Sequence, residues 1–128
     1  MAQILIVDDH EAVRTSLGEW LGESFPGNTI RTASSGEEAL EAAAATPPDL
    51  VLMDIGLPGI NGIEATRRLL DRHPATKVIV VSIHETSEHR AAAAAAGAAS
   101  FIPKRTLPND LTAAIHGLLR STGQPHLA

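Results

Sequence analysis

The sequence contains no cysteine and no tyrosine, and it has only two phenylalanines and one tryptophan. Without cysteine, disulfide bonds and thiolate metal sites are excluded, and the fold does not require an oxidising compartment. With so few aromatic side chains, the core must be built from Leu, Ile, Val and Ala. The chain also lacks a positively charged start followed by a long apolar stretch. Its longest uncharged apolar run, Ala91–Ala96 with its flanks, is far short of the ~20 residues that span a membrane. We therefore expect a cytoplasmic protein without a membrane segment.

Basic residues are also in deficit, with ten Lys and Arg against fifteen Asp and Glu, giving a net charge of −5. The basic residues are scattered, which argues against direct nucleic-acid binding by this segment. The length suits one hydrophobic core. We expect residues 1–120 to form one domain, and residues 121–128, which lack periodicity, to be a tail or the start of a linker. Any DNA-binding part would then lie beyond residue 128.

Five short apolar runs alternate with longer segments of helical periodicity. The runs are Ile4–Val7, Thr29–Ala33 (the weakest), Leu50–Met53, Val78–Val81 and Phe101–Ile102. Three of them are continuous, as is typical of strands covered by helices on both faces. The helices are expected over His10–Glu23, from Ser34 or Ser35 to Ala45, from Ile60 to before Pro74, from Ser87 to Gly97, and around Leu111–Leu119. The alternation predicts a doubly wound (βα)5 α/β fold with a five-stranded parallel sheet in the order 2-1-3-4-5, of the flavodoxin-like class.

Polar side chains follow four of these runs at the point where each predicted strand ends. Asp8 and Asp9 follow the first run, Asp54 the third, Ser82 the fourth and Lys104 the fifth. In the predicted strand order, ligands bind at the carboxyl ends of the first and third strands. We therefore expect three carboxylates, a hydroxyl and an ammonium group to converge on one crevice.

The charges in this crevice predict its chemistry. Two carboxylates 4 Å apart repel by about 4 kcal/mol at an effective dielectric constant of 20, so a cation must offset them. Mg²⁺ suits a site with one or two carboxylates plus a substrate phosphate. A carboxylate such as Asp54 can attack phosphorus and form an aspartyl phosphate. Mg²⁺ held by Asp9 and Asp54, together with Lys104 and Ser82, would then neutralise the phosphoryl oxygens.

At this point the residues resemble a known family. The motifs Val7-Asp8-Asp9-His10, Met53–Gly62, Val81-Ser82 and Phe101-Ile102-Pro103-Lys104 are similar to those of the response-regulator receiver domain of two-component systems, which has the CheY-like fold. The resemblance extends from about Ala2 to Leu119. The segment Asp54–Ala65 is most similar to the LuxR/NarL-type subfamily, whose members carry a C-terminal helix-turn-helix.

The resemblance implies a role for each residue. Asp54 would be phosphorylated by a sensor histidine kinase, Asp9 would ligate Mg²⁺ directly and Asp8 partly through water. The main-chain carbonyl of Gly56 would complete the protein's share of the ligands. Ser82 would be the switch hydroxyl, drawn inward on phosphorylation, and Phe101 the switch aromatic that fills the vacated space. Lys104 would contact the phosphoryl group.

The resemblance also implies how the signal leaves the domain. Phosphorylation would repack the face made by the fourth helix, the fifth strand and the fifth helix, and so control an output, with transcription through a helix-turn-helix absent from this chain as the favoured one. A second copy of the chain is a candidate partner after phosphorylation. The domain would be no enzyme, although it assists its own phosphorylation and dephosphorylation.

Two local features depart from the family pattern. Many receivers have a proline directly after the lysine, whereas here Arg105 follows and Pro103 precedes it. Gly56 and His84, each two residues past a site residue, face the reaction centre in the family, and Gly56 has no side chain to guide water. Of the six scattered histidines, only His84 is expected near the crevice.

Other interpretations stay open at this point. The chain could be a free-standing receiver in a phosphorelay, a Mg²⁺-dependent phosphatase with an aspartyl intermediate, or a receiver-like module that no longer accepts phosphate. Asp8 or Asp9 could simply cap the following helix. Phe101 could be an ordinary core residue.

Overall fold

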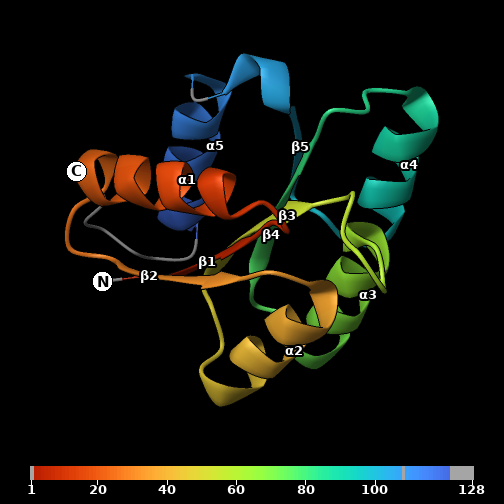
Figure 1. Cartoon of the computed structure of the whole chain (residues 1–128), viewed down its shortest axis with the longest axis horizontal. Coiled ribbons are helices and arrows are strands. Elements are labelled where there is room, and N and C mark those ends of the chain that lie inside the picture. The colour runs from red at the N-terminus through yellow and green to blue at the C-terminus, as the bar shows by residue number, and fades with distance from the viewer. Residues whose placement is uncertain (1, 108, 122–128) are drawn as a thin grey trace.

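The computed structural model describes residues 2–107 and 109–121, and shows five strands that form one parallel sheet (Figure 1). The strands are β1 (Gln3–Val7), β2 (Thr29–Ala33), β3 (Leu50–Asp54), β4 (Lys77–Ser82) and β5 (Ser100–Pro103). Their order in the sheet is β2-β1-β3-β4-β5, and every pairing is parallel. The predicted fold class and strand order are therefore confirmed.

Five α-helices and one 3₁₀ helix connect or follow the strands. They are α1 (Glu11–Ser24), α2 (Gly36–Ala45), α3 (Gly62–Arg72), α4 (Ser87–Ala95), the 3₁₀ helix η1 (Lys104–Thr106) and α5 (Asn109–Ser121). Helices α1 and α5 cover one face of the sheet, and α2, α3 and α4 cover the other (Figure 1). The predicted tail begins at the last residue of α5, and its remainder, residues 122–128, lies outside the described residues.

The apolar runs of the strands divide between two cores, one on each face of the sheet. Along β1, Ile4 and Ile6 point to the core under α1 and α5, whereas Leu5 and Val7 point to the core under the other three helices. Strands β3 and β4 alternate in the same way. A central strand needs apolar side chains in both directions, and this is why these sequence runs are continuous.

Alanine lets the helices lie close to the sheet. The residues that α2, α3 and α4 bury against it include four alanines, Ala39, Ala43, Ala65 and Ala93. Short side chains at these positions give a thin helix–sheet interface. The scarcity of aromatic residues in the sequence therefore matches this core.

The structure corrects the start of two helices. Helix α1 begins at Glu11 with His10 as its N-cap residue. Helix α3 begins at Gly62 and not at Ile60, because Asn61 is its N-cap and accepts a hydrogen bond from the Glu64 amide. Asparagine followed three residues later by glutamate is a capping signal that could have placed this boundary.

The topology brings the ends of β1, β3 and β4 to one edge of the sheet. Val7 pairs with Met53, and Asp54 pairs with Val81, so the residues that follow these strands emerge side by side. Among the described residues, no helix is long and apolar enough to cross a membrane.

Candidate functional site

Asp54 ends β3 at the carboxyl edge of the sheet, and its backbone is held by the start of α3. A side chain at Gly62 would place its Cβ 1.9 Å from the Asp54 carbonyl oxygen, so only glycine permits this approach. Asp54 is 7% exposed, and its Oδ1 accepts a hydrogen bond of 3.4 Å from the Gly56 amide. Both its backbone and its carboxylate are thus fixed by the loop that follows.

The end of β1 supplies two further carboxylates. Asp8 is 2% exposed, and its main-chain carbonyl accepts a hydrogen bond of 2.6 Å from Arg14 in α1. Its Oδ1 accepts a hydrogen bond from the His10 amide at 2.9 Å. Neither Asp8 nor Asp9 is the N-cap residue of α1, so helix capping does not account for the acidic pair.

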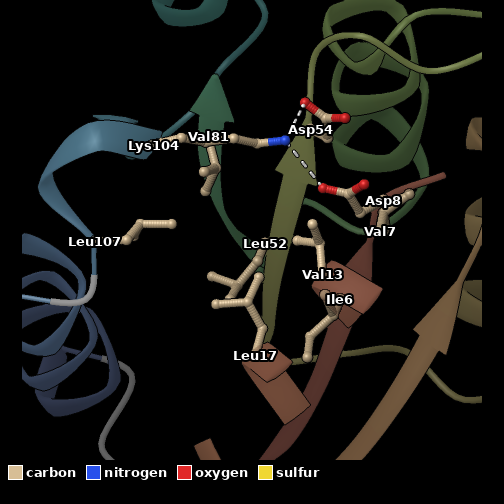
Figure 2. A pocket seen from close by; sticks show the side chains of 10 residues that line it. All are labelled: Ile6, Val7, Asp8, Val13, Leu17, Leu52, Asp54, Val81, Lys104 and Leu107. Carbon is tan, nitrogen blue, oxygen red and sulfur yellow. Dashed lines mark hydrogen bonds and ion pairs between the residues drawn. The ribbon is translucent and has the colours of Figure 1, made fainter. Parts of the chain in front are cut away.

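Lys104 joins the two strand ends. It comes directly after β5, and its Nζ lies 3.2 Å from Asp8 Oδ2 and 3.4 Å from Asp54 Oδ1. Figure 2 shows the lysine reaching across from η1 so that its ammonium group points between the two carboxylates. The predicted convergence of Asp8, Asp54 and Lys104 is present.

The floor under these charges is apolar. A cavity of about 20 Å³ lies beneath the Lys104 ammonium group, and Ile6, Leu52, Val81 and Leu107 are among the residues around it (Figure 2). Such surroundings give a carboxylate little solvation. Burial therefore raises the pKa of Asp54 above its ordinary value; the nearby Asp8 charge adds to the rise, while Lys104 and the Gly56 amide oppose it. Burial also disfavours the ammonium form of Lys104, but the charges of Asp54 and Asp8 outweigh this effect and raise its pKa.

His10 belongs to the same cluster, which corrects the expectation that only His84 would lie near the crevice. Its Nδ1 lies 3.1 Å from Asp8 Oδ1 and 3.2 Å from Asp9 Oδ1. One side-chain atom from each of Asp8, Asp9, His10 and Asp54 lies within 4.8 Å of the others, a spacing that could hold a metal ion. The sequence signal that could have indicated this was the position of His10 directly after Asp8 and Asp9.

The comparisons with known proteins bear on this arrangement. The family model of the response regulator receiver domain matches residues 4–116, a span that contains the acidic cluster, Ser82 and Lys104. The chain is a response regulator receiver domain. It is therefore a phosphoacceptor module of two-component signalling, and the resemblance of its motifs to this family is confirmed.

Relatives and solved structures agree with this assignment. The transcriptional activator protein ExaE of Pseudomonas putida is 42% identical over 91% of this chain and 54% of its own length. A LuxR-family response regulator from Aurantimonas superposes with a TM-score of 0.87 at 34% identity, covering 94% of this chain and 86% of that one. The response regulator TrrA of Thermotoga maritima, solved in complex with Mg²⁺ and a beryllium fluoride, gives a TM-score of 0.82 at 33% identity over 93% of this chain and 100% of that one. The receiver domain spans about half the length of the curated relatives it matches.

Ser82 lies in the same pocket of the receiver domain as Asp54. The pocket has a volume of about 150 Å³, and its walls include His10, Asp54, Gly56, Ser82, His84 and Lys104. Ser82 ends β4 and is buried, and its Oγ accepts a hydrogen bond of 2.9 Å from the His84 amide. Within the described residues the Ser82 hydroxyl donates no hydrogen bond, so it is available to a group in the pocket.

Phe101 lies apart from the acidic cluster, on β5. Its half-buried ring packs against the core under α2, α3 and α4, and the guanidinium of Arg90 in α4 lies 4.7 Å from the ring centroid. The ring therefore connects β5 to α4, as an ordinary core contact or a switch residue would.

Arg105 clarifies the chain path after Lys104. Both residues lie in the 3₁₀ turn η1, which the sequence analysis did not predict. While Lys104 turns into the site, Arg105 turns outward and donates two hydrogen bonds, of 2.7 and 2.8 Å, to the Glu85 carboxylate in the loop before α4. The residue directly after Lys104 thus forms an ion pair between η1 and the loop before α4.

Proposed function

We propose that Asp54 is the residue that accepts the phosphoryl group, from the phosphohistidine of a sensor histidine kinase. The observation that carries the proposal is the position of the Lys104 ammonium group, within 3.4 Å of both the Asp54 and the Asp8 carboxylates at the carboxyl edge of the sheet. A phosphoryl group on Asp54 would lie beside this ammonium group. Family membership favours this role over a phosphatase with turnover on a separate substrate.

The transfer step uses the two oxygens of Asp54 differently. Oδ1 is held by the Gly56 amide and Lys104, whereas Oδ2 has no hydrogen bond or ion pair with any described residue. Oδ2 attacks phosphorus, the bond between phosphorus and the donor nitrogen breaks, and its electron pair returns to the donor imidazole. Lys104 and the Ser82 hydroxyl stabilise the phosphoryl oxygens, since such transfers depend on positioning and charge neutralisation.

The cation in this proposal is Mg²⁺, held by the carboxylates of Asp8, Asp9 and Asp54 and by the Gly56 main-chain carbonyl. The donor set fits a hard divalent ion, because three carboxylates converge within 4.8 Å while Lys104 offers only one positive charge to two of them. When bound, the ion would neutralise phosphoryl and carboxylate charge. The solved complex of TrrA with Mg²⁺ supports this choice.

The switch is proposed to run from Ser82 to Phe101. A phosphoryl group would draw the Ser82 hydroxyl inward, Phe101 would fill the space, and the face formed by α4, β5 and α5 would repack. The Arg90–Phe101 contact places an α4 residue on the ring that would move. We place this signalling domain in the cytoplasm, with a phosphorylation-dependent homodimer as a candidate assembly.

The output is proposed to be transcription, through a helix-turn-helix elsewhere in a longer protein rather than through nucleic-acid binding by this segment. ExaE is named as a transcriptional activator, the Aurantimonas structure belongs to the LuxR family, and ExaE is about twice as long as its matched part. A free-standing receiver is the alternative.

The test is labelling by acetyl phosphate in the presence of Mg²⁺, followed by intact-mass spectrometry. We expect one phosphoryl group on the wild-type chain and none on Asp54→Asn, because the amide is no nucleophile toward phosphorus. EDTA should abolish labelling of the wild type. Undiminished labelling of Asp54→Asn would show that another residue is the acceptor.

A further inference from the structure

His10 is the one member of the acidic cluster whose side chain has no explained role. It is the N-cap residue of α1, yet its side chain makes no capping hydrogen bond within the described residues. The imidazole is 68% exposed, so burial does not hold it against the acids. Nevertheless its Nδ1 lies within 3.2 Å of a carboxylate oxygen of both Asp8 and Asp9.

The main chain of His10 is anchored beside the carboxylates. The His10 amide donates to Asp8 Oδ1, and its carbonyl accepts the first hydrogen bonds of α1, from the Val13 and Arg14 amides at 3.1 Å each. Both sides of the residue are thus anchored. The position of the ring then depends only on the two side-chain torsions, and in the structure they place Nδ1 against both acids.

The spacing of the ring nitrogen matches that of a metal ligand. In an octahedral ion with ligands at about 2.1 Å, neighbouring ligand atoms are about 3.0 Å apart and opposite ones about 4.2 Å apart. The two nitrogen–oxygen distances of 3.1 and 3.2 Å correspond to neighbouring ligands. The shorter one is also a hydrogen-bond contact with Asp8 Oδ1, and the imidazole would release the Nδ1 proton to solvent when it binds the ion. The whole set, with one atom each from Asp8, Asp9, His10 and Asp54, lies within 4.8 Å, so its widest separation would contract by about 0.6 Å around such an ion.

We propose that His10 Nδ1 is a ligand of the cation held by the acidic cluster, so that the receiver domain prefers first-row ions such as Mn²⁺ over Mg²⁺ more strongly than a carboxylate site would. First-row transition ions accept imidazole as a ligand more readily than Mg²⁺, which binds oxygen ligands and keeps its waters; Mn²⁺ is the weakest binder of these ions and the one that spin-echo spectroscopy can follow. The inference rests on the proposed function for the existence of the metal site. Beyond that function, the inference specifies which metal ion the site binds preferentially.

The test is electron spin-echo envelope modulation of Mn²⁺ bound to the chain, which detects a coordinated ¹⁴N nucleus. We expect a ¹⁴N signal in the wild type and its loss in His10→Ala. The matched control is His84→Ala, which removes the other histidine of the same pocket and should keep the signal. Mn²⁺ affinity, measured by titration calorimetry, should fall on the order of tenfold in His10→Ala, as when a group supporting a metal site is removed. The Mg²⁺ affinity should change much less.

Two outcomes would overturn the inference alone. A wild-type spectrum without ¹⁴N coupling, or a coupling that persists in His10→Ala, would show that the imidazole is only an ion-pair partner of the acids. The proposed function would survive either result. If Asp9→Ala leaves Mn²⁺ affinity unchanged, the cation does not bind in the cluster, and the metal site of the proposed function fails with it.

Discussion

Two groups of charged residues in this domain have opposite charge balances. At the edge of the sheet, Asp8, Asp9 and Asp54 share the single ammonium group of Lys104, which contacts two of them. On the outer face of α3, one carboxylate, Glu64, is paired with two guanidinium groups, those of Arg67 and Arg68. The sheet edge thus carries a surplus of acid, and the helix surface carries a surplus of base.

The pKa values follow this difference. Burial raises the pKa of Asp54, and Lys104 does not cancel the rise. Hydrogen bonds from Arg67 and then Arg68 lower the pKa of Glu64 to about 2. On α3 the two guanidinium groups already neutralise the carboxylate, so this surface cluster needs no further ion. The acidic cluster keeps excess negative charge beside the buried Asp8 and Asp54, so an added cation would stabilise it.

The largest expected effect comes from replacing Lys104, the lysine that contacts the acidic cluster. Lys104→Gln should slow labelling by acetyl phosphate roughly 10²- to 10³-fold, as the loss of a preorganised group facing transition-state charge does. Arg67→Gln, which removes a cation from the surface cluster, should leave the rate unchanged. Stopped-flow or mass-spectrometric time courses measure both. Equal rates for Lys104→Gln and the wild type would mean that Lys104 is only a structural ion-pair partner.

A smaller effect is expected on stability from neutralising Asp54. Because its pKa is raised in the folded state, the ionised form is penalised at pH values above the ordinary 3.8, and the penalty fades as the pH falls toward that value. Asp54→Asn should therefore stabilise the metal-free domain at pH 7, by about 0.5–2 kcal/mol, the usual range for relieving a strained functional site. Urea unfolding in EDTA at several pH values measures this gain.

The control for this prediction is the direction of the pH dependence. The gain from Asp54→Asn should shrink as the pH is lowered from 7 toward 4. A gain that stays constant with pH would indicate that packing, and not charge, is responsible. A loss of stability at pH 7 would mean that Lys104 compensates the buried carboxylate fully.

Most of the acidic cluster was predictable because it follows from topology. Asp8, Asp9, Asp54 and Lys104 each come after an apolar run, and a parallel sheet brings the ends of such runs to one edge. Ser82 could be placed at this edge for the same reason, since it ends the apolar run of β4. The fold itself was predictable because the central strands must be apolar on both faces, which leaves continuous runs in the sequence.

Other features depend on directions and distances that no local pattern encodes. His10 was missed because a residue at a strand–helix turn can point into the crevice or away from it, and the sequence does not say which. The pairing of Glu85 with Arg105 joins residues twenty positions apart on two loops. The turn η1 spans three residues, too few for a periodic signal. The roles of Ser82, Phe101 and Gly56 remain predictions, since geometry alone gives them positions but not motions.

The smallest expected effect concerns the surface cluster. Glu64 accepts hydrogen bonds from Arg67 Nε at 3.1 Å and from Arg68 Nε at 2.7 Å, and it also pairs with the Arg67 terminal nitrogen. A lowered pKa favours folding above the ordinary value of 4.5, and this contribution is lost as the pH falls toward about 2. All three side chains are on the surface, so salt should weaken the effect.

Side-chain carboxyl ¹³C shifts can follow both acids in one titration. In dilute buffer, Glu64 should titrate near pH 2, and either Arg67→Gln or added salt should move its midpoint toward 4.5. Asp54 should titrate above its ordinary value and respond less to salt, because burial is not screened. If salt moved both midpoints equally, screened charges and not burial would set the pKa of Asp54. The burial of Asp54 would then be no reason to expect a cation at the acidic cluster.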